Sequence, residues 1–204
     1  RAFELMVEDG SLRVLKILSH ASAVIAEGEV EQLTTQRRVE TDEDQYLTII
    51  SAKTAALFAA ACRIAPVVAE AGEEAEVALE KYGKYLGIAF QLVDDVLDYG
   101  SKQDIMGKGV GDDFRDGKVT LPVILAYARG SDEDRAFWRD AMLGERISDE
   151  DLTHAIALLR GTDALSETIE RARHYGRRAL DALAQFPAGK AKSALSEAVE
   201  FAIS

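Results

Sequence analysis

The sequence predicts an all-α protein that folds as a single domain. Apolar side chains recur at intervals of three, four and seven residues along most of the chain, which is the spacing of one face of an α-helix. No segment alternates apolar and polar residues as a half-buried strand would. The 204 residues can bury one sizeable core, and 48% apolar residues with only three prolines fit a globular helical chain.

Two long helices are expected first. Ser11 follows a glycine and can cap a helix that runs to about Arg38. Thr41 and Asp44 resemble a capping box at the start of the second helix, which we expect Pro66 to limit.

A third helix should follow Gly72 and run to about Tyr99. Its apolar residues at helical spacing predict a core-facing stripe of Leu79, Leu86, Phe90, Val93 and Leu97. Residues 100–117 then form the only long irregular segment, and a connection of that length in a compact domain is usually functional or disordered.

The rest of the chain predicts shorter helices. Pro122 lies where a first helical turn tolerates proline. Ser148 and Asp151 resemble a capping box. Beyond the helix that begins near Pro122, the apolar pattern predicts helices at 132–143, 149–160, 163–186 and 189–203.

Charge and cysteine usage exclude several classes of protein. The net charge of −12 argues against a nucleic-acid partner and against docking on an anionic membrane. Cys62 is the only cysteine, so neither a disulfide nor a zinc site is expected, and a reducing cytoplasm fits this usage. We expect no bilayer-spanning run and no signal peptide. Because Arg1 begins what resembles the middle of a helix, the chain is expected to start inside a larger protein.

Three carboxylates cluster near the end of the third helix. Asp94, Asp95 and Asp98 form a polar strip with Gln91, at spacings of three, four and seven residues. Like charges there destabilise a helix, and the C-terminal end of a helix disfavours negative charge, so a divalent cation would stabilise the arrangement. Mg²⁺ accepts one or two carboxylates together with phosphate oxygens. The alternative interpretation is a solvated acidic helix end.

Three lysines could supply positive charge to the same site. The predicted buried stripe of the second helix is Tyr46, Ile49, Ile50 and Leu57. Lys53, followed by Thr54, falls on this stripe, where a lysine is normally paired or engaged with an anion. A lysine whose stem packs while its ammonium reaches water is an equally good interpretation. Lys108 and Lys118 punctuate the glycine-rich loop, which could equally be a solvated loop of mixed charge.

Other catalytic constellations are not apparent in the sequence. His20, His154 and His174 lie far apart and predict neither a triad nor a metal set. Trp138 is interpreted as a packing anchor.

Together these motifs resemble a known family. FQLVDDVLDY (residues 90–99), then GKGVGDDFRDGKVTLP (107–122), preceded by the Lys53–Thr54 pair, resemble the C-terminal part of the trans-isoprenyl (polyprenyl) diphosphate synthases. The resemblance is greatest to the bacterial long-chain enzymes that make quinone side chains, and it covers essentially residues 1–204.

The resemblance implies an isoprenoid-synthase-type helical bundle around a central cavity. It implies that Asp94, Asp95 and Asp98 hold Mg²⁺ on an allylic prenyl diphosphate. Lys53, Lys108 and Lys118 would contact that diphosphate, and the pair Thr54 and Gln91 would lie near the reacting carbons. The implied reaction joins isopentenyl diphosphate to the allylic diphosphate and extends a linear trans-polyprenyl chain.

The family's first aspartate-rich motif and its isopentenyl diphosphate residues are absent from this sequence. We therefore expect residues 1–204 to be the C-terminal part of one synthase domain, with the N-terminal helices missing and no condensation by this chain alone. The resemblance also implies a cytoplasmic homodimer. The alternative is a non-catalytic regulatory subunit of a heteromeric prenyl diphosphate synthase.

Overall fold

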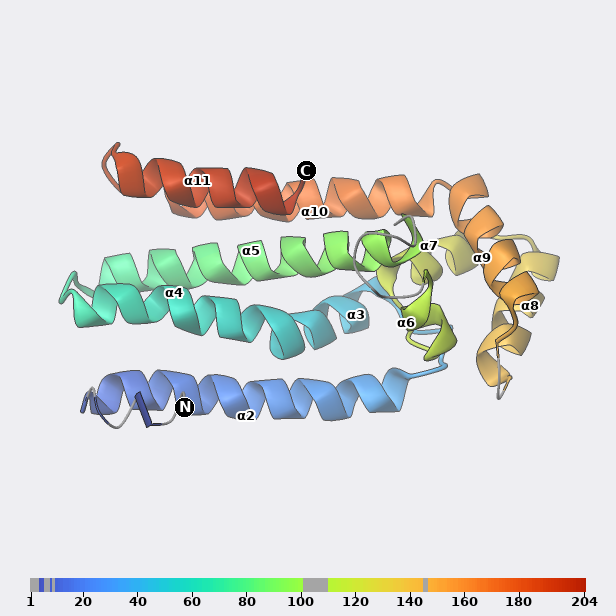
Figure 1. Cartoon of the computed structure of the whole chain (residues 1–204), viewed down its shortest axis with the longest axis horizontal. Coiled ribbons are helices and arrows are strands. Elements are labelled where there is room, and N and C mark those ends of the chain that lie inside the picture. The colour runs from blue at the N-terminus through green and yellow to red at the C-terminus, as the bar shows by residue number, and fades with distance from the viewer. Residues whose placement is uncertain (1–3, 6–7, 9, 101–109, 145–146) are drawn as a thin grey trace.

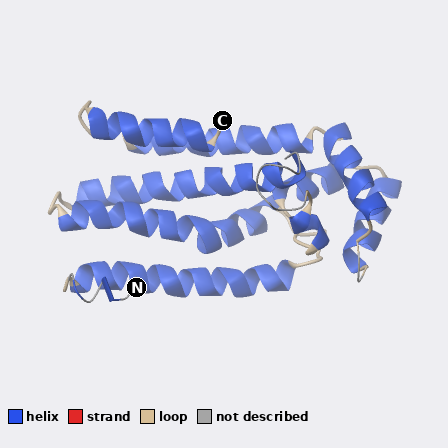
Figure 2. Ribbon diagram, in the orientation of Figure 1, coloured by secondary structure: helices blue, strands red, loops and turns tan. Residues whose placement is uncertain are grey.

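The computed structural model describes residues 4–5, 8, 10–100, 110–144 and 147–204. Every regular element within these ranges is a helix, and no strand occurs among them (Figure 2). The predicted all-α class is therefore confirmed.

The first half of the chain forms long helices packed side by side. They are α2 (Leu12–Thr35), α3 (Glu43–Ile50), the π-helix η1 (Ser51–Ala55), α4 (Ala56–Val68) and α5 (Glu73–Gly100). Helices α3, η1 and α4 follow one another without a break and lie between α2 and α5 (Figure 1). The second predicted helix is thus a single run that contains a π turn, which the sequence analysis did not anticipate.

The second half covers the other side of α5 and one end of the bundle. Its helices are α6 (Asp112–Arg115), α7 (Leu121–Arg129), α8 (Asp132–Leu143), α9 (Asp149–Gly161), α10 (Ala164–Ala182) and α11 (Lys190–Ala202). Helix α10 packs along α5, and α11 folds back beside α10 (Figure 1). Helices α7, α8 and α9 gather at one end. Helix α5 packs against α4 on one side and α10 on the other, so it lies in the middle of the molecule.

Side-chain caps explain where several helices begin. Ser11 accepts a hydrogen bond from the N–H of Val14, as predicted. Ser148 and Asp151 form the predicted capping box of α9. The prediction for α3 is wrong by one residue, because Asp42 is the cap and accepts from the N–H of Gln45 at 2.8 Å. The hydroxyl of Thr41 donates instead to the carbonyl of Arg38, which holds it in the preceding turn.

Pro66 does not end its helix, contrary to prediction. It lies inside α4, which continues to Val68. Proline lacks one backbone donor, but the next turn closes through the N–H of Ala69, which donates to the carbonyl of Ala65 at 3.0 Å. The proline therefore precedes the end of the helix by two residues.

Two clusters of apolar side chains stabilise the bundle. The larger one joins the second half of α5 to α7, α8, α9 and α10, and Trp138 is fully buried within it, as predicted for a packing anchor. The smaller one joins the first half of α5 to α10 and α11 around Tyr82 and Leu183. Burial of this apolar surface supplies the main driving force for the fold.

One helical run is long and apolar enough to cross a membrane by length and composition. It spans Glu43–Val68, so the expectation that no such run exists is wrong. A single run of this kind is weak evidence for a membrane span, because core helices of soluble proteins meet the same criterion.

Candidate functional site

The π-helix η1 places Lys53 and Thr54 beside both neighbouring long helices. A side chain at Gly28 of α2 would come within 2.8 Å of the backbone nitrogen of Lys53. A side chain at Gly87 of α5 would come within 2.7 Å of the Cα of Ala55. Glycine at both positions lets α2 and α5 approach the π turn closely, and π turns are frequent at functional sites.

The π turn also changes which side of the second helical run is buried. Tyr46, Ile49 and Ile50 are buried, as the predicted stripe requires, but Leu57 is 52% exposed. A π turn inserts one extra residue, which rotates the residues after it by about 100° relative to those before it. Leu57 is therefore on another side, while Lys53, within the π turn, is partly buried with 30% of its side chain exposed.

Helix α5 carries the acidic cluster in its last two turns. Asp95 is 2% exposed, whereas its neighbour Asp94 is exposed. The predicted core stripe of α5 is only partly correct, because Val93 is buried but Phe90 and Leu97 are exposed. Apolar residues occupy more than one side of this helix, and its packing against α4 and α10 decides which of them are buried.

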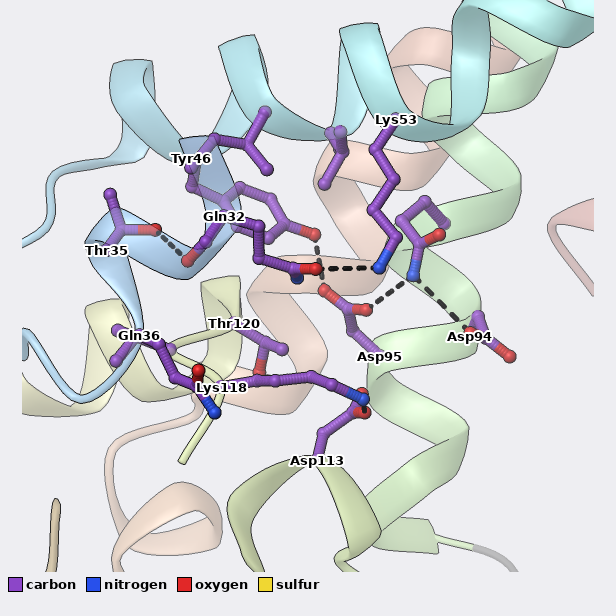
Figure 3. A pocket seen from close by; sticks show the side chains of 14 residues that line it. Gln32, Thr35, Gln36, Tyr46, Lys53, Asp94, Asp95, Asp113, Lys118 and Thr120 are labelled. Carbon is purple, nitrogen blue, oxygen red and sulfur yellow. Dashed lines mark hydrogen bonds and ion pairs between the residues drawn. The ribbon is translucent and has the colours of Figure 1, made fainter. Parts of the chain in front are cut away.

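These residues line a pocket of about 240 Å³. Its walls come from α2, α3, η1, α5, α6 and the segment that leads into α7 (Figure 3). The lining residues are Gln32, Thr35, Gln36, Tyr46, Ile49, Ile50, Lys53, Gln91, Asp94, Asp95, Asp113, Lys118, Val119 and Thr120. Of the predicted site residues, Lys53, Gln91, Asp94, Asp95 and Lys118 therefore meet in one pocket.

A chain of hydrogen bonds connects Thr54, Gln91, Asp95 and Tyr46. The Thr54 hydroxyl donates to Oε1 of Gln91 at 2.8 Å. Nε2 of Gln91 then donates to Oδ1 of Asp95 at 2.8 Å and approaches Oδ2 of Asp94 at 3.4 Å. The hydroxyl of Tyr46 donates to the other oxygen of Asp95. Thr54 thus contacts the site through Gln91 and does not line the pocket itself.

Burial dominates the electrostatics of Asp95 and Tyr46. It raises the pKa of Asp95 to about 7, although the hydrogen bonds from Tyr46 and Gln91 favour the charged form. Burial, followed by the negative charge of Asp95, raises the pKa of Tyr46 well above its ordinary value. The phenol therefore remains the donor in this pair.

Asp98 faces the start of α6 and not the pocket. Its carboxylate accepts the backbone N–H of Asp113 at 3.2 Å, and its carbonyl accepts the N–H of Gly111 at 2.8 Å. A carboxylate at the N-terminal end of a helix satisfies donors that lack an intrahelical partner. Burial, with repulsion from Asp113, raises the pKa of Asp98 to about 6. Asp98 thereby fixes the position of Asp113.

Lys53 and Lys118 approach the pocket from opposite walls (Figure 3). Nζ of Lys53 donates to Oε1 of Gln32 at 2.7 Å and lies 3.4 Å from Glu29. Nζ of Lys118 lies 2.7 Å from Asp113 and 3.3 Å from Asp116.

Burial opposes the charge of Lys118, but its contacts with Asp113 and Asp116 leave its pKa raised, so this lysine is a permanent cation. The third predicted lysine, Lys108, lies outside the described residues.

Among the pocket residues that the sequence does not predict, three contact the predicted ones. Gln32 holds Lys53, Tyr46 holds Asp95, and Asp113 contributes a third carboxylate. Asp113 lies in the glycine-rich loop segment whose alternative interpretation is a solvated loop of mixed charge. Tyr46 belongs to the predicted apolar stripe, and apolar spacing gives no information about the partner of its hydroxyl.

The donor set of the pocket suits a hard cation that also binds a phosphate. Within the described ranges, no group of three or more His, Cys, Asp or Glu side chains is arranged to hold a metal ion by itself. That result is compatible with Mg²⁺, which usually takes one or two carboxylates and completes its shell with water and phosphate oxygens. Asp94, exposed at the pocket, is a carboxylate of the required kind.

Comparison with known proteins identifies the family to which this helical bundle belongs. Residues 1–159 match the family described as polyprenyl synthetase. The chain is 41% identical over 197 residues to an octaprenyl diphosphate synthase of Haemophilus influenzae, covering 96% of this chain and 59% of that protein. It thus spans about three fifths of the length of that relative.

Solved structures show the same similarity. A polyprenyl synthase of Caulobacter crescentus, complexed with calcium and isoprenyl diphosphate, is similar with a TM-score of 0.95 and 46% identity, over 99% of this chain and 62% of that one. A decaprenyl diphosphate synthase of Rhodobacter capsulatus is similar with a TM-score of 0.90 and 44% identity, over 98% and 62%.

The fold and the pocket define an all-α protein of the isoprenoid synthase class. This chain belongs to the polyprenyl synthetase family, which is the family predicted from its motifs.

Proposed function

We propose that the protein to which this chain belongs is a prenyltransferase. It joins isopentenyl diphosphate to an allylic prenyl diphosphate and extends a linear trans-polyprenyl diphosphate. The observation that carries the proposal is the pocket that Lys53 and Lys118 line together with Asp94 and Asp113. Ammonium groups can bind a diphosphate, and carboxylates in the same pocket can hold the divalent cation that accompanies it.

The lysines are the groups of this chain that would bind the diphosphate. Each ammonium is already oriented by a side chain, Lys53 by Gln32 and Lys118 by Asp113. When the carbon–oxygen bond of the allylic substrate breaks, the electron pair leaves with the diphosphate, and fixed ammonium groups stabilise the negative charge that develops. Mg²⁺, held by carboxylates of the acidic cluster, would neutralise further charge on the same group.

Gln91 would act next to the reacting carbons, and Thr54 behind it would orient its amide. The double bond of isopentenyl diphosphate attacks the allylic carbon, and the adduct then loses one proton, which the released diphosphate can accept, so that a double bond is restored. The amide oxygen of Gln91, which Thr54 holds in place, presents a negative dipole that would favour a positively charged carbon nearby. Apolar side chains such as Ile49 and Ile50 line the same pocket and limit the access of water, which would capture the cation.

Two similarities support this proposal. The Caulobacter crescentus structure is described as a complex with calcium and isoprenyl diphosphate, which are a divalent cation and a ligand of the required kinds. The Haemophilus influenzae relative is named an octaprenyl diphosphate synthase. Because this chain spans about three fifths of that relative, we propose that condensation also requires the part of the protein beyond residues 1–204.

We also propose that the full-length protein is a cytoplasmic homodimer. Val30 and Leu33 lie one turn apart on α2 and are both largely exposed, which suits burial against further protein. Sedimentation equilibrium of the full-length protein should give twice the monomer mass. A monomer across the micromolar range would refute the dimer but not the activity.

The test of the activity is a product assay on the full-length protein. It is incubated with farnesyl or geranylgeranyl diphosphate, radiolabelled isopentenyl diphosphate and Mg²⁺, and the products are sized by chromatography. Linear products longer than the allylic primer are expected, and EDTA should abolish them. Lys53→Ala should reduce elongation strongly, whereas Lys81→Ala, at an exposed position of α5, should not. No extended product from the wild-type protein would refute the proposal, and would favour a regulatory subunit.

A further inference from the structure

The two adjacent aspartates of α5 are held in different ways. Successive residues of an α-helix point about 100° apart, so Asp94 and Asp95 cannot present their carboxylates in the same direction. Asp94 is exposed at the pocket, and Asp95 is buried behind it. Both line the same pocket, which raises the question of which one would contact a metal there.

Both oxygens of Asp95 already have protein donors. Oδ1 accepts from the amide of Gln91 at 2.8 Å, and Oδ2 accepts from the hydroxyl of Tyr46 (Figure 3). A buried carboxylate without such donors would strongly destabilise the fold. The contact that Asp94 receives from the same amide is long, at 3.4 Å, so its oxygens are much less engaged.

Tyr46 connects this arrangement to the rigid part of the molecule. Its ring is buried on α3 within the larger apolar cluster, so the hydroxyl cannot follow a movement of Asp95. At the other end, Thr54 donates to Oε1 of Gln91 and thereby turns the amide nitrogen toward the two carboxylates. Hydrogen bonds thus connect the Asp95 carboxylate of α5 directly to α3 and, through Gln91, to the π-helix η1.

We propose that Tyr46 is a positioning residue that, together with Gln91, holds Asp95 in the core so that Asp94 is the member of the pair that reaches the metal. This inference rests on the proposed function and refines the expectation that all three aspartates bind Mg²⁺. Asp95 acts through its neighbours: it fixes the amide of Gln91, and that amide borders Asp94.

The experiment measures Mn²⁺ binding by electron paramagnetic resonance in the full-length protein, with inorganic diphosphate present and without turnover. Asp94→Asn should lower the number of Mn²⁺ ions bound in the presence of diphosphate, because it removes the exposed carboxylate of this pocket and leaves the rest of the protein unchanged. Tyr46→Phe, which removes one oxygen atom and keeps the ring, should weaken Mn²⁺ binding by up to about tenfold, the lower end of what direct partners of metal ligands contribute, because Tyr46 acts through Asp95 and Gln91. Asp95→Asn should weaken binding to the same degree as Tyr46→Phe.

A double-mutant cycle separates positioning from general loss of stability. If Tyr46 acts through Asp95, the double variant Tyr46→Phe/Asp95→Asn should bind Mn²⁺ as weakly as Asp95→Asn alone, and no weaker. Additive losses would overturn the inference. Thermal unfolding in EDTA, followed by circular dichroism, shows whether each variant is folded at the temperature of the titration.

Two further results would also overturn the inference. One is an Asp95→Asn variant that binds as few Mn²⁺ ions as Asp94→Asn, because Asp95 would then itself be a ligand. The other is unchanged Mn²⁺ affinity in Tyr46→Phe. The product assay measures a different outcome. If the wild-type protein fails to elongate prenyl diphosphates, the proposed function is refuted.

Discussion

The hydroxyl of Thr54 lies 2.8 Å from Oε1 of Gln91 and joins the π-helix to α5 beside the acidic cluster. Without the π turn, the residues after it would face another direction, as the exposure of Leu57 shows. The irregular turn and the acidic helix therefore form one unit, and a change in either should affect both.

Removing the Thr54 hydroxyl tests this unit most directly. Thr54→Val keeps the shape of the side chain but cannot donate to Gln91, so the amide loses its fixed orientation. One such hydrogen bond contributes about 1 kcal/mol, which corresponds to roughly fivefold in turnover. We expect a lower kcat in the product assay with the full-length protein, and Thr54→Ser, which keeps a donor, should recover most of it. Equal activity of the valine and wild-type proteins would contradict the prediction.

Asp94 should be the most sensitive acidic residue of the pocket. Asp94→Ala in the full-length protein should reduce turnover by orders of magnitude, because the exposed carboxylate that shares the pocket with the two lysines is lost. The steady-state rate of isopentenyl diphosphate incorporation measures this. Glu74→Ala removes an exposed carboxylate from the first turn of the same helix and serves as the control. A near-normal rate for the Asp94 variant would exclude it as a metal ligand.

The metal-free protein should become less stable as the pH rises from about 4 to about 7. Burial raises the pKa of Asp95 to about 7 and that of Asp98 to about 6, both from an ordinary value of 3.8. In this window the folded chain binds more protons than the unfolded chain. The two protonated carboxyl groups therefore stabilise the fold fully at pH values below their pKa in the unfolded chain. This stabilisation is lost as the pH rises through their raised pKa values in the folded chain.

Urea unfolding in EDTA, repeated at several pH values, measures this slope. The double variant Asp95→Asn/Asp98→Asn should flatten it, since an amide does not titrate. Groups whose pKa is lowered, such as Glu167, act in the opposite direction below about 4.5 and should be unaffected by the substitution. A slope that survives in the double variant would assign the pH dependence to other residues.

The sequence was sufficient for the helices and for much of the pocket. Apolar spacing gave the all-α class, and the acidic strip with Lys53 and Lys118 indicated a site that the structure brings together. The π turn could not be foreseen, because no residue of Ser51–Ala55 is excluded from an α-helix. For the same reason the stripe was extended to Leu57, which is exposed.

The separate environments of Asp95 and Asp98 were also beyond reach of the sequence. Spacing placed both on one polar strip, but long-range packing against Tyr46 buries the first, and the start of α6 engages the second. Asp113 joins the pocket through the same packing, since its backbone N–H is held by Asp98. Contacts between residues far apart in the chain have no local signal in the sequence.

Gly87 should be essential for the geometry of the π turn. A Cβ at this position would lie 2.7 Å from the Cα of Ala55, which is backbone and cannot turn aside as a flexible side chain could. Alanine within a helix is favoured over glycine by about 1 kcal/mol, but overpacking of this kind costs about 1 to 3 kcal/mol. We therefore expect Gly87→Ala to lower the free energy of unfolding, and to lower turnover further by displacing Thr54 from Gln91.

The matched control is Gly161→Ala, at the last residue of α9. No atom lies within 4 Å of the added Cβ there, and the backbone is not left-handed, so this variant should be neutral or slightly stabilising. Urea unfolding and the product assay compare the two variants with the wild-type protein. If Gly87→Ala proves as stable and as active as Gly161→Ala, then α5 can move away from the π turn without cost, and the close approach does not set the positions of Lys53 and Thr54.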